Sequence, residues 1–160
     1  FRLDTVAGKH NDIGGPCDLE GARFGDPENT MVGPLNSYGC LFNTSFLFTL
    51  TNHYRIGFAA GVDVKGMAEA WKGIGIDLLL RQRLVYAKPE EYAEDCKLLG
   101  GQLIVPMHHD AAFDWNADMN AYARDVNGLL RQDGVPMAMF NPQRLKWYKV
   151  QTSICAEAML

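Results

Sequence analysis

Two adjacent histidines follow the most strand-like stretch of the sequence, and they are the first candidates for chemistry. Gly101–Asp110 reads GQLIVPMHHD, an apolar run that stops at Pro106 and leads into the histidine pair. Such a run behind glycines predicts a buried strand, and side chains directly after a strand lie at the rim of a sheet, open to solvent. We therefore expect His108, His109 and Asp110 to belong to a site.

Two other residues of these types occupy similar positions. His10 follows Phe1–Val6, an alternating segment that predicts a strand, and Asp63 follows Arg55–Ala60, the second arm of a predicted hairpin. Imidazole and carboxylate groups together suit zinc, manganese or iron. An isolated His or Asp in a loop is more often a solvated or helix-capping residue. The metal-site hypothesis therefore requires these side chains to meet at one rim of a shared sheet.

The elements that position these residues alternate between strands and helices. Strands are predicted over Phe1–Val6, Ser37–Leu50, Arg55–Ala60, Ile76–Leu80, Gln102–Val105, Val135–Phe140 and Arg144–Val150, with His53 near the tip of a hairpin. Helices are predicted over Lys65–Lys72, from Lys88 to the Gly100-Gly101 pair, and over Asp118–Gln132. Strand, helix and strand in succession form βαβ units, so we expect an α/β fold with one mixed sheet and flanking helices.

Composition limits the function further. A chain of 160 residues with 48% hydrophobic content fits a single domain, and its net charge of −4 without basic clusters argues against nucleic-acid binding. No apolar run approaches the length of a membrane span. Four cysteines without a CxxC pair favour reduced thiols and a cytoplasmic setting. Lys9, Arg23 and Arg81 could attract a phosphate near the rim, although scattered basic residues are usually solvated.

Five strings, taken in order, carry a family resemblance. The first two are Val6–His10, which is similar to a strand ending in histidine, and Phe58–Asp63, which is similar to a hairpin with a Gly-Asp turn. Ile76–Leu80 is similar to an apolar strand with aspartate, and Lys88–Glu94 to a helix that starts with Pro-Glu-Glu. Ile104–His108 is similar to a strand ending in Pro-Met-His. From residue 1 to about residue 150 the chain resembles the C-terminal half of a metallo-β-lactamase-fold hydrolase, particularly the L-ascorbate-6-phosphate lactonase-like branch. Val105-Pro106-Met107-His108 is the most specific piece.

The resemblance implies an αββα sandwich of which this chain supplies about half. It also implies that His10 is a ligand of one metal, Asp63 the catalytic carboxylate that bridges two metals, and His108 a ligand of the second, with His109 as the alternative. The metals would be divalent, zinc first, with manganese or iron also suitable. They would activate water to attack an ester, lactone or phosphodiester bond of a small-molecule substrate.

Two departures from the family pattern leave alternatives open. Val62 is interposed in the Gly-Asp turn, and the His-x-His-x-Asp-His string that supplies most ligands is missing. The missing ligands would come from a second polypeptide carrying the N-terminal half, or from a homo-oligomer; the start at Phe1, inside a predicted strand, hints at an upstream segment. The alternative is a non-catalytic structural or interaction subunit. A third reading is a small-molecule binding module with the Gly- and Pro-rich loop Asn11–Asn36 as a lid.

Overall fold

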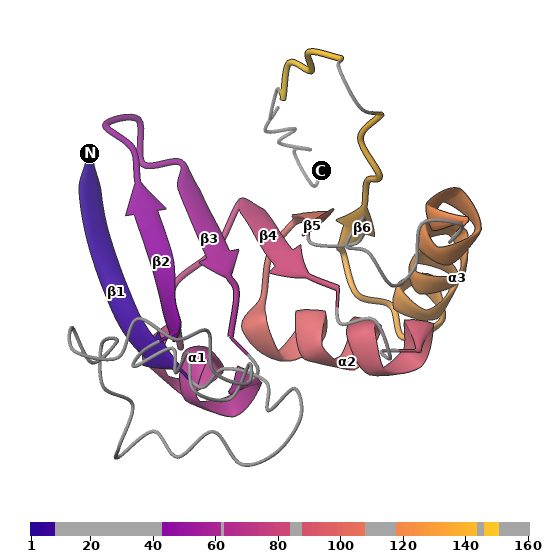
Figure 1. Cartoon of the computed structure of the whole chain (residues 1–160), viewed down its shortest axis with the longest axis horizontal. Helices are drawn as coiled ribbons and strands as arrows, with labels where there is room; N and C mark the ends of the chain where they lie inside the picture. The colour runs from indigo at the N-terminus through magenta and orange to yellow at the C-terminus, as the bar shows by residue number, and fades with distance from the viewer. Residues whose placement is uncertain (9–42, 62, 84–87, 108–117, 144–145, 151–160) are drawn as a thin grey trace, which may run out of the picture.

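A computed structural model describes residues 1–8, 43–61, 63–83, 88–107, 118–143 and 146–150, and it confirms the α/β class (Figure 1). Its single mixed sheet has the strand order β1-β2-β3-β4-β5-β6. The strands are β1 (Arg2–Gly8), β2 (Asn43–Thr49), β3 (Arg55–Ala59), β4 (Leu78–Gln82), β5 (Leu103–Met107) and β6 (Ala138–Met139). The helices are α1 (Val64–Ala70), α2 (Pro89–Leu99) and α3 (Met119–Gln132).

The strand directions bring most carboxyl ends to one edge of the sheet. β2 pairs antiparallel with both β1 and β3, whereas β3, β4, β5 and β6 follow one another in parallel. β1 therefore runs in the same direction as β3. The carboxyl ends of β1, β3, β4 and β5 lie along the same side, which we call the carboxyl edge. The predicted β2–β3 hairpin turns at the opposite edge, where His53 adopts a φ of 64°.

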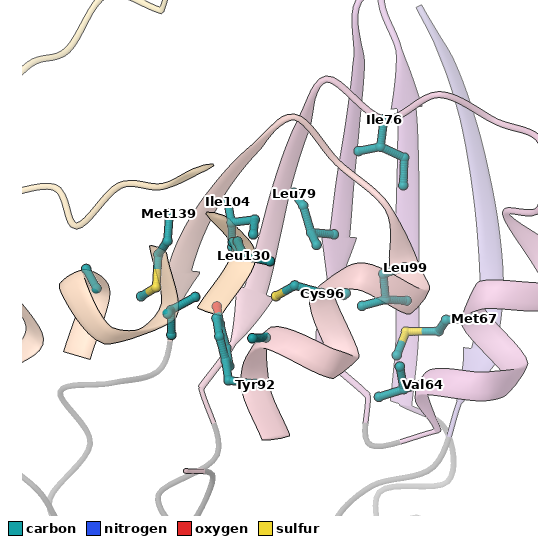
Figure 2. Packing of buried hydrophobic residues seen from close by; sticks show 14 of the residues in the cluster. Val64, Met67, Ile76, Leu79, Tyr92, Cys96, Leu99, Ile104, Leu130 and Met139 are labelled. Carbon is teal, nitrogen blue, oxygen red and sulfur yellow. The ribbon is translucent and has the colours of Figure 1, made fainter. Parts of the chain in front are cut away.

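The helices cover one face of the sheet. Alternate strand residues on this face are at most 4% exposed and share one cluster with helix side chains: Leu47, Ala59, Leu79, Ile104 and Met139. Figure 2 shows Leu79 and Ile104 from the sheet gathered with Tyr92 and Cys96 from α2. Each parallel crossover carries its helix over this face, so the three described helices form a single layer (Figure 1).

The opposite face of the sheet, which we call the second face, is also apolar. Residues paired in register share a face of the sheet, and here they form two rows across the strands. The rows are Phe48, Ile56, Leu78, Leu103 and Phe46, Phe58, Leu80, Val105. All eight side chains are half-buried rather than buried. Within the described part of the chain, no helix forms a layer over the second face.

The prediction that Pro106 ends its strand is wrong, because β5 continues to Met107. The main chain of Ile104 faces β6 and its carbonyl accepts a 2.8 Å hydrogen bond from the Phe140 amide. Pro106 comes two residues after Ile104, so its main chain also faces β6. At that level β6 has already ended, at Met139. The missing N–H of Pro106 therefore removes no hydrogen bond between strands.

Other boundaries also differ from the expectation. β4 begins at Leu78, later than the predicted Ile76, and extends through Arg81 to Gln82. The strand predicted over Arg144–Val150 is wrong for residues 146–150, which form no strand. Helices α2 and α3 match their predictions: Gly100, with a φ of 78°, follows the end of α2, and Asp118 caps α3. None of the described helices is long and apolar enough to cross a bilayer.

A side chain closes the outer side of β6. The Met139 amide donates a 2.7 Å hydrogen bond to Asn127 Oδ1, and Asn127 Nδ2 donates a 2.9 Å hydrogen bond to the Met139 carbonyl. Asn127 belongs to α3, so this pair of bonds also fixes the last strand to its helix. The amide side chain takes the place that a further strand would occupy.

Candidate functional site

The carboxyl edge brings together the strand ends that precede the predicted ligands. His10 comes two residues after β1, Asp63 follows β3, and His108 directly follows β5. One strand separates β1 from β3 and one separates β3 from β5, so neighbouring ends in this series are about 10 Å apart. Helix α1 also contacts β1. The end of β1 is therefore close to the helix that Asp63 begins.

Only one of the predicted ligands belongs to the part of the chain that the structure describes. His10, His108 and His109 lie outside the described residues, as do Asp110, Lys9 and Arg23. Among described side chains, no three His, Cys, Asp or Glu residues come together as a group that could hold a metal. The strand ends thus share an edge, and the convergence of the histidine side chains stays a prediction.

Asp63 is the N-cap of α1. Its Oδ1 accepts a 3.1 Å hydrogen bond from the Gly66 amide, and its main-chain carbonyl accepts one of 3.2 Å from the Met67 amide. These bonds satisfy N–H groups that have no partner inside a helix, and the carboxylate also lies at the positive end of the helix dipole. Among the described residues, Oδ2 has no hydrogen-bond partner. One carboxylate oxygen thus fixes the side chain at the start of α1.

Gly66 makes this placement of Asp63 possible. A β-carbon at Gly66 would lie 2.6 Å from Asp63 Oδ2 and 3.0 Å from Asp63 Cγ, closer than such atoms can approach. The carboxylate therefore packs directly against the glycine. Any larger residue at position 66 would move the Asp63 side chain away from its present position.

A buried arginine holds the main chain just before Asp63. The Arg81 side chain is 1% exposed, and its Nη1 donates hydrogen bonds of 2.8 Å to the Gly61 carbonyl and 3.2 Å to the Ala59 carbonyl. Its Nη2 forms a 3.1 Å ion pair with Asp95 Oδ2 on α2. Both readings of Arg81, as a residue that attracts phosphate and as a solvated residue, are therefore wrong, because the guanidinium is inside the protein and hydrogen-bonded there.

Cys96, a buried thiol whose pKa Arg81 influences, is structural. Burial raises the pKa of Cys96 to about 12, and the positive charge of Arg81 opposes the shift without cancelling it. Burial also raises the pKa of Tyr92, whose hydroxyl donates a 3.0 Å hydrogen bond to the Arg81 carbonyl. Because a thiol must ionise to act as a nucleophile or metal ligand, neutral Cys96 serves as a core residue.

Sequence reasoning missed the roles of Arg81 and Gly66. Arg81 follows Leu79 by two residues, so both side chains point to the same face of β4, and that alternation was a usable signal. Gly66 lies three residues after an acidic residue at the start of a predicted helix, where the N-cap side chain meets the N3 amide.

No protein-family model matches the sequence, and no curated protein matches it as a relative.

Proposed function

We propose that this chain is the C-terminal half of a metal-dependent hydrolase with a metallo-β-lactamase-like αββα fold. The bond attacked would be an ester, a lactone or a phosphodiester in a small-molecule substrate. The observation that carries the proposal is the shared carboxyl edge of β1, β3 and β5, with Asp63 at the central position. Remaining metal ligands would come from another polypeptide or from a second copy in a homo-oligomer.

The spacing along the carboxyl edge suits two metal ions better than one. Four strand spacings separate the ends of β1 and β5, which is about 19 Å, too far for both following histidines to reach one ion without a large inward turn. Asp63 follows the middle strand of the series. A carboxylate there can bridge two ions, one on the side of His10 and one on the side of His108.

The residues present fit divalent metal ions. Carboxylate and imidazole are ordinary ligands of zinc, manganese and iron, and Oδ2 of Asp63 has no protein partner among the described residues. The Gly66 amide would act as the group that orients this ligand by holding Oδ1. A bound divalent metal supplies Lewis-acid activation of water and stabilises negative charge on the substrate.

The second face supports the idea that this chain is half of a larger layer structure. Its two rows of Phe, Leu, Ile and Val side chains form a broad apolar surface on the side of the sheet away from the described helices. A half-buried apolar surface of that extent favours association, and a second sheet packed face to face would bury it further. The other half of an αββα sandwich has this shape.

A non-catalytic subunit is the second candidate, and one observation favours it. The N-cap hydrogen bond from Gly66 to Asp63 is by itself a sufficient reason for an aspartate at this position. In that case the chain would keep the fold and the interaction surface without holding metal.

One pair of matched substitutions separates the two functions. Asp63 and Asp118 are both helix N-caps, with Asp118 Oδ1 accepting hydrogen bonds from the amides of Asn120 and Ala121. Asparagine caps helices as well as aspartate does, so Asp63→Asn and Asp118→Asn should both keep the stability of the wild type. Asparagine has no negative charge, so only Asp63→Asn should weaken metal binding.

The measurement is metal content together with intact mass of the purified native assembly. The hydrolase proposal expects a second polypeptide and about two equivalents of zinc, manganese or iron, reduced in Asp63→Asn and unchanged in Asp118→Asn. A metal-free wild-type assembly with an intact fold would support the non-catalytic candidate instead. Equal metal content in all three proteins would contradict the assignment of Asp63 as a ligand.

A further inference from the structure

We propose that Arg81 is a positioning residue that fixes the turn between β3 and α1 and thereby orients the Asp63 carboxylate. The inference rests on the proposed function, since a fixed Asp63 carboxylate matters most where it binds a ligand. Arg81 belongs to neither segment: it lies on β4, the strand next to β3. It therefore connects the candidate site to the interior of the fold.

The guanidinium joins two different elements at the carboxyl edge. Nη1 reaches the carbonyls of Ala59, the last residue of β3, and Gly61, while Nη2 reaches Asp95 on α2. A planar guanidinium directs its N–H groups in several fixed directions, which a lysine ammonium on a flexible stem does not reproduce. The arrangement ties the main chain at Ala59 and Gly61 to β4 and, through Asp95, to α2.

Gly61 is itself buried, and it precedes Asp63 by two residues. Restraint at the Gly61 carbonyl thus limits where α1 begins. From there the restraint continues through Asp63 Oδ1 to the Gly66 amide, the first contact inside the helix. These hydrogen bonds thus join Arg81 to Gly61 and Asp63 to Gly66, and one residue of the sequence separates Gly61 from Asp63.

Stability alone does not account for a charge at position 81. Removing a guanidinium from water carries a large desolvation cost, and Asp95, its carboxylate partner among the described residues, is 34% exposed. An apolar side chain of similar volume would fill the same space without that cost and often stabilises a protein. An apolar side chain would not donate hydrogen bonds to the carbonyls of Ala59 and Gly61. The guanidinium at position 81 is therefore explained by its hold on this main chain.

The test uses amide hydrogen exchange of the full chain at Gly66, whose N–H is held by the Asp63 carboxylate. Arg81→Met removes the hydrogen bonds to the Ala59 carbonyl, the Gly61 carbonyl and Asp95. Arg81→Lys keeps a positive charge beside Asp95 but loses the two hydrogen bonds that Nη1 donates to the carbonyls. In each variant we expect Gly66 to exchange about fivefold faster, the effect of losing one N-cap hydrogen bond. If Arg81→Met does not fold, Arg81→Lys decides the question, because it leaves the buried charge paired.

The control is Leu130→Ala, which destabilises the core at a fully buried residue of α3, away from the turn. It should lower overall stability while Gly66 exchange keeps its wild-type rate under native conditions. If Arg81 had only a structural role, its variants would behave like Leu130→Ala. Unchanged Gly66 exchange in a folded Arg81 variant would therefore overturn the positioning role.

Metal binding by the same variants separates this inference from the proposed function. With Co²⁺ as the probe, Arg81→Lys should bind the ion more weakly than the wild-type assembly, and Leu130→Ala should bind it equally well. If the wild type binds no Co²⁺, the hydrolase proposal fails, while the exchange data still decide whether Arg81 positions the turn. Faster Gly66 exchange with unchanged Co²⁺ binding would overturn the functional importance of Arg81 and leave the metal site intact.

Discussion

The carboxylate of Asp63 lies directly against the α-carbon of Gly66, so close that a β-carbon there would stand 2.6 Å from Oδ2. The same glycine donates its amide to the other carboxylate oxygen at 3.1 Å. Gly66 therefore positions Asp63 in two ways: its amide donates a hydrogen bond to Oδ1, and its lack of a β-carbon makes room for Oδ2. This contact is the most specific local constraint on the candidate site.

Gly66→Ala should disturb the site with little change in stability. Alanine favours the helix by about 1 kcal/mol, and the displaced Asp63 side chain loses an N-cap worth about the same. The two effects oppose each other, so the free energy of unfolding in urea should stay close to that of the wild type. Metal retention by the native assembly should fall, as measured by elemental analysis.

Gly128→Ala is the matched control for this substitution. Gly128 lies inside α3, and a β-carbon there would meet nothing within 4 Å. This variant should gain about 1 kcal/mol of stability with unchanged metal content. A similar gain in Gly66→Ala would show that Asp63 does not cap α1 in solution.

The two faces of β4 should respond differently to truncation. Leu79 is 0% exposed in the core, so Leu79→Ala should lower the free energy of unfolding by about 3 kcal/mol. Leu80 is half-buried on the second face, and Leu80→Ala should cost the isolated chain less but weaken its association with the proposed second polypeptide. Urea unfolding and native mass spectrometry measure the two effects. Undiminished association of Leu80→Ala would count against a partner on the second face.

Stability should fall in alkaline solution because of Cys96. Burial raises the pKa of the native Cys96 thiol from 9.0 to about 12. Below pH 9 the thiol is protonated in both the native and the unfolded state. Above pH 9 the unfolded thiol ionises, whereas the native thiol stays protonated. The unfolded state then binds fewer protons, and the free energy of unfolding falls by up to about 1.4 kcal/mol per pH unit.

The measurement is urea unfolding between pH 9 and 10. Burial raises the pKa of Tyr122 from 10.0 to about 12, so Tyr122 adds to the same trend, mainly above pH 10, and does so with and without the Cys96 thiol. Cys96→Ala should show a shallower dependence on pH in this interval, although its stability at neutral pH is lower because of the cavity. Equal slopes in the two proteins would mean that Cys96 is accessible to solvent in the native state.

His108→Ala should reduce metal affinity by at least about tenfold and leave the fold unchanged, because the residue follows β5 at the carboxyl edge. His53→Ala is the control, since His53 is exposed in the hairpin turn at the opposite edge. Calorimetric titration of the native assembly with zinc compares the two. If His109→Ala lost the metal instead, the ligand would be the second histidine of the pair.

Hydrophobic periodicity was sufficient to predict the α/β class and most of the described strands and helices. The hairpin, the helices that became α2 and α3, and the parallel strands around them follow from runs and alternations with clear start and stop residues, such as Pro89 and Gly100. Pro106 misled the prediction because the cost of a missing N–H depends on where the neighbouring strand ends, which is a tertiary fact. The reduction of β6 to Ala138–Met139 is tertiary as well.

The candidate site was predicted only in part. The positions of His10, Asp63 and His108 after strands are visible in the sequence, and parallel topology explains why these strand ends share an edge. The burial of Arg81 was not foreseen, because a single charged residue after an apolar run usually reaches solvent. The alternation with Leu79 indicated the face of the sheet, but the partners of the side chain, carbonyls from another strand and Asp95, are not visible in the local sequence.

Asn127 has a consequence for how copies of this chain can polymerise. A filament built by strand exchange needs two available flanks in every molecule, one to receive and one to donate. In the described part of the chain, the β6 flank is occupied at Met139 by the Asn127 side chain, which leaves the β1 flank. Strand-to-strand joining would therefore end at a closed pair and would not grow into a fibre.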